Sequence, residues 1–168
     1  MERASGVLLP IFSLPSKYGI GCFSKEAYQF IDRLKAAGQS YWQILPLGPT
    51  GYGDSPYQSF STFAGNPYFI DLDLLASEGL LDKKEYVSVN WGDDVSRIDY
   101  GRLYEQRYPV LKLAAKRFLE NEPEDFETFC ELQAFWLEDY ALFMTLKDTH
   151  GGCSWWQWED ELKRRDHS

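Results

Sequence analysis

The first fifty residues contain two short apolar runs separated by a stretch with helical periodicity. The runs, Val7 to Phe12 and Tyr41 to Leu47, are typical of buried strands because few polar residues interrupt them. Between them, Ser24 fits the N-cap of a helix, and Gly38 fits the position just beyond its end. The positions on one helical face are Ala27, Phe30, Ile31, Leu34 and Ala37. This order of strand, helix and strand predicts a βαβ unit.

A long connection follows the second apolar run. Residues 48–67 are rich in glycine, proline, hydroxyl-bearing and aromatic residues, and no lysine or arginine lies among them. Loops of this length inside compact domains are usually functional or disordered, and the aromatic side chains argue for order. Beyond the loop, we expect Tyr68 to Leu72 to form a short strand and Leu74 to Leu81 a short helix or turn.

The second half of the chain has the periodicity of charged helices. Residues 101–119 predict one helix, in which Pro109 must cause a kink or mark a first turn. One face of this helix carries Leu103, Arg107, Val110, Leu111, Ala114 and Phe118. Residues 123–147 predict a second helix, and residues 159–165 a short charged one. The intervening tryptophans, Trp155, Trp156 and Trp158, are expected in a core rather than in a binding site.

Composition and charge exclude several classes of protein. The net charge of −9 disfavours binding to the phosphates of a nucleic acid. No uninterrupted apolar run is long enough for a membrane span, and no basic stretch precedes an apolar one as in a secretory signal. The three widely spaced cysteines predict reduced thiols in a cytoplasmic protein, and we expect no metal site.

The chemistry of residues 48–67 suits a neutral, hydroxyl-rich ligand. Loops at the carboxyl ends of parallel strands are where α/β proteins place their ligands. Tyrosine rings can cover the apolar face of a sugar while hydroxyl, amide and carboxylate groups bond its rim. Phosphate ligands fit poorly, because Lys83 and Lys84 are the only cations between positions 39 and 96. A well-ordered structural loop remains an equal alternative on composition alone.

The same loop carries a resemblance to a known family. Residues 40–68 read SYWQILPLGPTGYGDSPYQSFSTFAGNPY and strongly resemble the amylomaltases, the 4-α-glucanotransferases of glycoside hydrolase family 77. Further matches are GVLLP at 6–10, SLP at 13–15, YGIG at 18–21 and WLEDYALFM at 136–144. Many members carry His-Pro where this chain has Pro10-Ile11. The resemblance extends over essentially all 168 residues.

The resemblance implies an α/β fold, the amino-terminal fragment of a TIM (β/α)8 barrel with a largely helical insertion. Residues 1–75 would hold the first two β/α units and the substrate loop 48–67, and residues 76–168 the insertion, leaving the barrel incomplete. The family transfers an α-1,4-glucan segment to a glucose or glucan acceptor with retention, in maltodextrin, starch and glycogen metabolism. It uses no cofactor. Its catalytic carboxylates would lie on later strands, so the chain alone is predicted to be inactive.

The resemblance also assigns roles to four residues. Tyr57 is similar to a tyrosine that stacks on the sugar just before the scissile bond, and Ser55 to a serine of the same subsite. Tyr52 and Tyr104 are similar to two tyrosines of a remote glucan-binding groove. The alternatives are a turn hydroxyl for Ser55 and ordinary surface tyrosines for Tyr52 and Tyr104. For the whole chain, the alternative is a non-catalytic glucan-binding or purely structural remnant of a longer enzyme.

Overall fold

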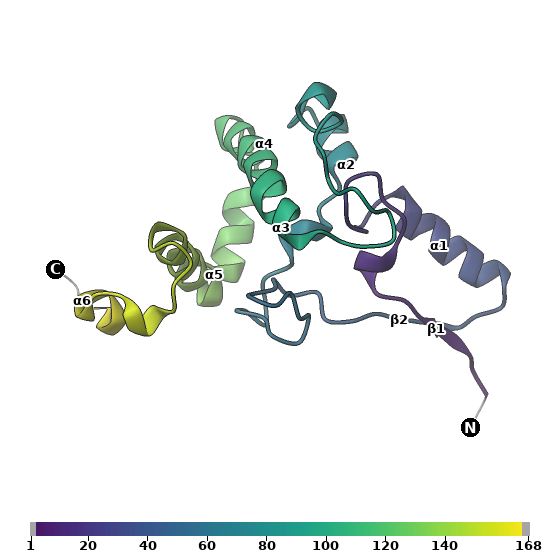
Figure 1. Cartoon of the computed structure of the whole chain (residues 1–168), viewed down its shortest axis with the longest axis horizontal. Helices are drawn as coiled ribbons and strands as arrows, with labels where there is room; N and C mark the ends of the chain where they lie inside the picture. Colours follow the sequence, from purple (N-terminus) through teal and green to yellow (C-terminus); the bar gives the residue numbers. More distant parts are fainter. Residues whose placement is uncertain (1–2, 166–168) are drawn as a thin grey trace. The chain divides into compact units, whose positions relative to one another are not determined.

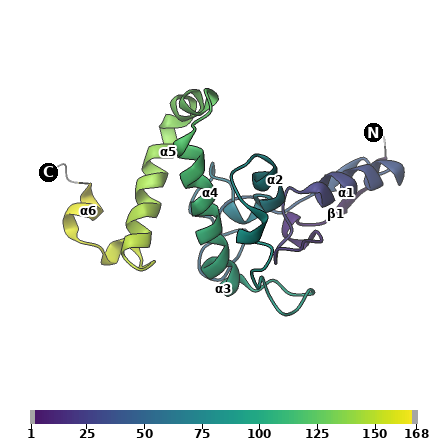
Figure 2. The same ribbon diagram turned by 90° about the horizontal axis from the view of Figure 1, so that it is seen from above.

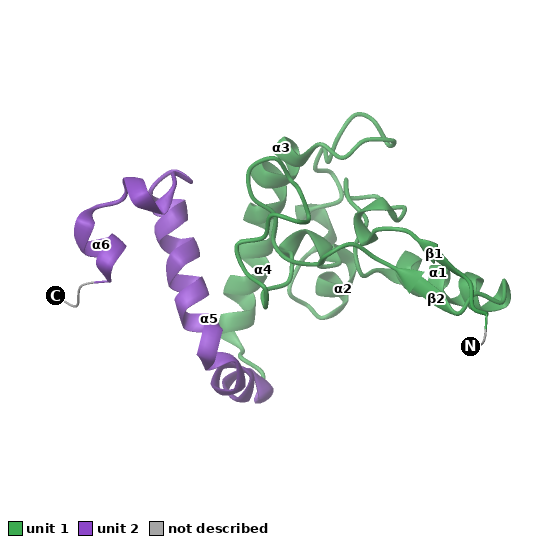
Figure 3. Cartoon of the chain, turned by 90° about the horizontal axis from the view of Figure 1, so that it is seen from below, with its two compact units in different colours: residues 1–123 green, residues 124–168 purple. Residues whose placement is uncertain are grey.

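The computed structural model describes residues 3–165 and divides the chain into two compact units. One unit comprises residues 1–123 and the other residues 124–168, as Figure 3 shows by colour. The first unit contains both strands and the loop 48–67. The second contains one long helix followed by two short helical segments.

The expected βαβ unit opens the first unit. Strands β1 (Gly6–Leu8) and β2 (Tyr41–Gln43) pair in parallel, with Val7 opposite Trp42. Helix α1 (Lys25–Ala36) connects them and lies beside the strands in Figures 1 and 2. The Ser24 side chain accepts a hydrogen bond from the Glu26 N–H, and Gly38 follows the helix with a φ of +69°. Both helix ends are therefore as the sequence predicts.

The strands differ from the prediction in length and burial. Each has three residues, and the first apolar run turns at Pro10 into the 3-10 helix η1 (Ile11–Ser13). The Leu9 N–H still donates to the Gln43 carbonyl at 3.0 Å, but Ile11, the next residue whose N–H would face β2, already belongs to η1. The Leu8 side chain is 56% exposed, and Val7 and Tyr41 are also exposed. The strands that the apolar runs predict are therefore short and exposed in this chain, whose described residues form a sheet of two strands.

Tyr68 to Leu72 does not form the expected strand. Instead, the 3-10 helix η2 (Pro67–Phe69) is followed by α2 (Leu72–Ser77). The Asn66 side chain accepts from the Tyr68 N–H at 3.0 Å, and the Asp71 side chain accepts from the Asp73 N–H at 2.9 Å. Because each side chain satisfies a backbone donor at a helix start, the two caps favour two helical turns over an extended segment.

A nearly continuous helical stretch ends the first unit. It consists of α3 (Tyr100–Arg102), the π-helical segment η4 (Leu103–Arg107) and α4 (Tyr108–Glu120). The short 3-10 helix η3 (Lys83–Glu85) precedes this stretch and is separate from it. Pro109 lies in the first turn of α4, just after the π-helical segment, so the missing proline N–H is accommodated where the helical hydrogen-bond pattern changes. The core of the unit gathers around η1, η2, α2 and α4.

The second unit contains α5 (Asp125–Thr149), η5 (Trp155–Gln157) and α6 (Asp160–Arg164). Trp158 is buried, and its ring lies 5.6 Å from that of Phe143 and 5.3 Å from that of His150. Trp155 and Trp156 are exposed, so the prediction of a tryptophan core holds for Trp158 alone. Among residues 3–165, no helix has the combined length and apolar character that crossing a bilayer requires.

Candidate functional site

The loop 48–67 is closed at its base and braced inside. The Asn66 N–H donates to the Leu47 carbonyl at 2.8 Å, which joins the two ends of the loop. Thr50 and Ser59 form an antiparallel bridge across it. A Cβ on Gly48 would clash with the Ser59 side chain, so the close approach of the two sides requires glycine at 48 or a shift of Ser59. The loop is therefore an ordered structure that follows β2.

The tip of the loop holds a strained acidic residue. Asp54 has a φ of +54°, and its N–H donates to the Gly51 carbonyl at 3.0 Å. Left-handed backbone at a non-glycine residue is uncommon and costs of order 1 kcal/mol. Burial raises the pKa of the Asp54 carboxyl. Burial raises the pKa of Tyr68 as well, and the charges of Tyr108 and Asp54 add to the rise.

Tyr57 and Ser55 lie on the same loop. The Tyr57 side chain is 72% exposed, and it makes no ring contact or side-chain hydrogen bond with the described residues. The Tyr57 N–H donates to Ser55 Oγ at 3.3 Å, and the Gln58 N–H donates to the Ser55 carbonyl at 3.1 Å. Ser55 thus shapes the turn that presents an open tyrosine ring, which is the structural role offered as its alternative.

Tyr52 and Tyr104 lie in different surroundings. Tyr52 is fully exposed on the loop and has no ring contact among the described residues. Tyr104 is an exposed residue of η4, with its ring 5.5 Å from that of Tyr108. Tyr108 in turn lies 5.5 Å from Tyr68, so Tyr104 belongs to a tyrosine cluster near the end of the loop. No contact joins Tyr52 to this cluster within the part of the chain that the structure describes.

Arg107 anchors the segment that follows the loop. Its side chain is completely buried, and it donates to the Tyr18 carbonyl at 3.1 Å and to the Ile70 carbonyl at 2.7 Å. The guanidinium carbon lies 5.7 Å from the centre of the Trp91 ring. Burial lowers the pKa of Arg107. Sequence reasoning gave it no role, although its place among apolar residues on one helical face was the available signal.

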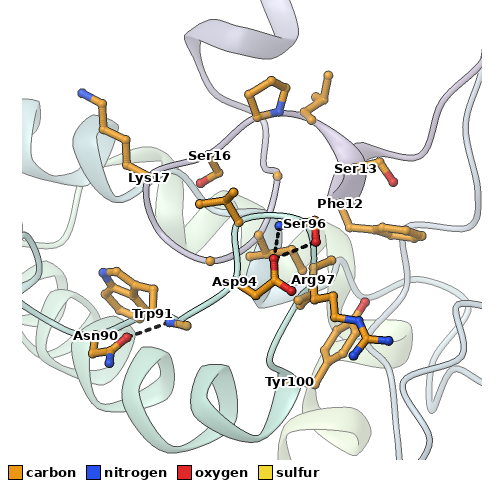
Figure 4. Close-up of a pocket in the computed structure, with 18 of the residues that line it drawn as sticks. Phe12, Ser13, Ser16, Lys17, Asn90, Trp91, Asp94, Ser96, Arg97 and Tyr100 are labelled. Carbon is orange, nitrogen blue, oxygen red and sulfur yellow. Dashed lines mark hydrogen bonds between the residues drawn. The ribbon is translucent and has the colours of Figure 1, made fainter.

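A broad hollow of about 1100 Å³ lies elsewhere on the first unit (Figure 4). Most residues of the segments 12–21 and 87–100 line it, and no residue of the loop 48–67 does. Lys17 and Arg97 lie on opposite sides of it in Figure 4, so the two cations do not converge on one anion. The Asp94 carboxylate near the centre of the hollow accepts a hydrogen bond from the Ser96 N–H at 2.8 Å, so it already has a partner. The hollow offers no set of converging groups for catalysis.

Three carboxylates, those of Asp73, Asp139 and Glu159, have structural partners. Asp73 lies in helix α2, and its Oδ1 accepts hydrogen bonds from the hydroxyls of Tyr18 and Tyr86. Asp139 pairs with Arg165, and Glu159 with His150. Within the described part of the chain, no three His, Cys, Asp or Glu side chains come together in a way that would hold a metal ion.

The βαβ unit makes this an α/β protein. The loop after its second parallel strand is braced, contains no lysine or arginine, and carries an exposed tyrosine ring. Comparison with known proteins gives the family. Residues 9–168 match the family model described as 4-alpha-glucanotransferase, and the chain belongs to this family, glycoside hydrolase family 77.

Individual relatives agree with this assignment. The chain is 53% identical over 155 residues to a 4-alpha-glucanotransferase of Clostridium butyricum, covering 92% of this chain and 32% of the relative. It is 51% identical over 170 residues to that of Thermus thermophilus, covering 99% and 33%. An amylomaltase of Streptococcus agalactiae in complex with acarbose superposes with a TM-score of 0.93 at 45% identity, covering 99% and 34%. The chain spans about a third of the length of the relatives it matches.

Proposed function

We propose that this chain is the amino-terminal, sugar-contacting part of a 4-α-glucanotransferase. The complete enzyme transfers an α-1,4-glucan segment to a glucose or glucan acceptor with retention, in maltodextrin, starch or glycogen metabolism. Family membership supports the reaction class. The observation on this chain that carries the proposal is Tyr57, an open ring on an ordered loop that contains no lysine or arginine.

The ring of Tyr57 suits the face of a neutral sugar. Its hydroxyl and ring lack partners among the described residues, whereas the loop beneath it is fixed by the Asn66–Leu47 hydrogen bond. A braced loop loses little conformational entropy when a ligand binds. In this proposal, Tyr57 stacks on the sugar before the scissile bond, and Ser55 holds the turn and lines the same subsite.

Tyr52 and Tyr104 are proposed as contacts in a second glucan groove, remote from the scissile bond. Both side chains are exposed, and Tyr104 is backed by the Tyr108 ring, which holds it in place. Aromatic rings supported from one side present the other side to a ligand at little entropic cost.

The chemistry itself needs two carboxyl groups about 5–5.5 Å apart, one as nucleophile and one as acid and base. In our proposal, later barrel strands of the family supply this pair, and no residue of this chain is catalytic. No cofactor takes part. The structural partners of Asp73, Asp139 and Glu159 support this division.

We further propose that residues 1–75 are the first two β/α units of a (β/α)8 barrel and that residues 76–168 form a helical insertion. The parallel pairing of β1 and β2 around α1 supports the first part, and the helices α3 to α6 support the second. A cytoplasmic location is part of the proposal, and the three unpaired cysteines are consistent with it.

Two measurements on the chain as it stands test the proposal. Incubation with maltotriose should release no glucose and form no longer glucans, whereas transfer by a clean preparation would contradict the absence of catalytic residues. Maltoheptaose should bind, and Tyr57→Ala should weaken that binding. Tyr28→Ala, which removes a similarly exposed tyrosine from α1, is the control. Equal binding by the wild type and the Tyr57 variant would contradict the role of the loop.

A further inference from the structure

Trp155 and Trp156 form an exposed aromatic corner on the second unit. Their side chains are 52% and 63% exposed, and their ring centres lie 6.4 Å apart with the ring planes at 76°. Tryptophan is a large side chain that usually lies mostly in a core. Two adjacent exposed indoles, set almost at right angles, therefore present two apolar walls to a ligand.

The turn that carries these rings is rigidly held. The Gln157 N–H donates to the Ser154 carbonyl at 2.9 Å, and the Trp158 N–H donates to the Trp155 carbonyl at 3.1 Å. Trp158 is buried directly after the turn and packs against Phe143 and His150. Because one tryptophan anchors the turn, the other two are pre-organised, and binding a ligand costs little ordering entropy.

The polar groups around the corner favour a neutral ligand. The nearest acidic residues in sequence each have a partner, Glu159 the ring of His150 and Asp160 the ammonium group of Lys163. The indole N–H groups of Trp155 and Trp156 have no acceptor among the described residues, so each offers a free donor. An apolar wall with hydrogen-bond donors at its edge matches a sugar ring, which has C–H faces and hydroxyls around its rim.

We propose that the corner formed by Trp155 and Trp156 is a second contact site for an α-1,4-glucan chain, separate from the loop 48–67. One glucose unit lies on the face of one indole, and the other indole closes against its edge. The proposal rests on the α-glucan substrate class proposed above. It adds a glucan-contact site on the second unit, besides the loop of the first unit.

Titration of the isotope-labelled chain with maltoheptaose tests the site through the indole N–H signals. Trp155→Phe and Trp156→Phe assign the two signals, and both should shift in a saturable manner. Trp156→Ala should weaken the affinity read from the Trp155 signal by about tenfold, or about 1.4 kcal/mol. Phe129→Ala removes another exposed aromatic ring (48%) from the same unit and should leave this affinity unchanged. Near-UV circular dichroism checks that Trp158 stays packed in each variant.

The outcomes separate this site from the loop. In the Tyr57→Ala chain, the shifts of Trp155 and Trp156 should persist. If these shifts persist and the Tyr57→Ala chain also binds maltoheptaose with the overall affinity of the wild type, the proposal for the loop fails. The proposal for the corner then stands. Signals that do not move with maltoheptaose would overturn the site. An equal loss of maltoheptaose affinity in Phe129→Ala would also overturn it. So would indole shifts that follow protein concentration, because these would mean that the corner contacts a second copy of the chain.

Discussion

The hydroxyl of Tyr86 donates a hydrogen bond of 2.8 Å to Oδ1 of Asp73 in helix α2. Tyr86 is completely buried, and the same oxygen accepts a second hydrogen bond, of 2.7 Å, from the Tyr18 hydroxyl. The rings of the two tyrosines meet edge to face at 5.2 Å. One carboxylate thus joins the segment after β1 to α2 and to the segment after η3, and these three segments form much of the core.

Removing one of these hydroxyls should destabilise the chain measurably. Tyr86→Phe keeps the ring packing but removes a hydrogen bond to a charged group, which typically contributes about 1.5–3 kcal/mol. We expect a loss at the lower end of that range, because Tyr18 still satisfies Asp73. Urea unfolding at low protein concentration measures it. Tyr28→Phe on the surface of α1 should change the unfolding free energy by less than about 0.5 kcal/mol, and an equal change in both variants would contradict the role of the cluster.

The same cluster predicts a loss of stability in acid. Burial alone would raise the pKa of Asp73, but hydrogen bonds from Tyr18 and Tyr86 outweigh it and lower this pKa below the ordinary value of 3.8. A carboxyl whose pKa is lower in the folded state contributes stability above its unfolded pKa and loses it as the pH falls through the folded pKa. Hydrogen bonding from Arg117 lowers the pKa of Glu85 to about 2 in the same way.

The contribution of these two carboxyls to stability should therefore be nearly constant above about pH 5 and fall steeply below about pH 4. The Tyr18→Phe/Tyr86→Phe double variant should start from a lower stability and lose less of it on acidification, since its Asp73 returns toward an ordinary pKa. Unfolding curves at a series of pH values compare the two slopes. Equal slopes of unfolding free energy against pH in the two proteins would show that the tyrosine hydroxyls do not lower the pKa of Asp73.

Arg107 should tolerate no substitution, including lysine. Its guanidinium donates to two carbonyls, Tyr18 O and Ile70 O, in directions that a single ammonium group cannot reproduce. Arg107→Met leaves both acceptors without this donor, and Arg107→Lys leaves at least one, at about 1–3 kcal/mol for each unsatisfied group. Hydrogen exchange around residues 18–22 and 66–70 should rise in both variants. Arg33→Met on exposed α1 is the control, and unchanged exchange in Arg107→Lys would contradict the prediction.

The two strands should make the chain associate with itself. Both outer edges of the described sheet lack a neighbouring strand, and Val7, Leu8 and Tyr41 are exposed beside them. Open edges with apolar side chains pair with other chains. Leu8→Lys should reduce the association measured by sedimentation velocity. Leu74→Lys, on α2 at a similar exposure of 52%, should reduce it less. A monodisperse monomer in the wild type would show the prediction wrong.

The sequence predicted the ends of a helix correctly where a single residue determines each end. Ser24 and Gly38 bound α1 as predicted, because each satisfies or relieves a backbone constraint of its own helix. The strand expected at Tyr68 to Leu72 failed for the same kind of reason. Asn66 and Asp71 act as caps there, and their local hydrogen bonds outweigh the apolar content of the segment.

Features that depend on contacts between residues far apart in the sequence could not be predicted from such local signals. The burial of Arg107 requires carbonyls from Tyr18 and Ile70, far apart in the sequence. The different fates of the tryptophans follow from the packing of Trp158 on Phe143, which leaves Trp155 and Trp156 outside. The loop 48–67 was recognisable from its residues, whereas its bracing by Asn66 and Leu47 appears in the structure alone.

In a complete enzyme carrying this sequence, Tyr57 should act more through its ring than through its hydroxyl. Stacking on a sugar buries apolar area at roughly 25 cal/mol per Å², so one face can contribute on the order of 1–2 kcal/mol. A single hydroxyl hydrogen bond contributes about 1 kcal/mol net, and water can replace part of it. The open ring and the fixed backbone of the loop favour the first contribution.

Tyr57→Phe should therefore keep much of the activity, whereas Tyr57→Ala should lose about tenfold or more in kcat/KM. Initial rates with maltotriose as donor and acceptor give both values, with circular dichroism to confirm that each variant folds. Tyr28→Ala on α1 should match the wild type. If the phenylalanine variant is as impaired as the alanine variant, the hydroxyl carries the interaction and stacking does not.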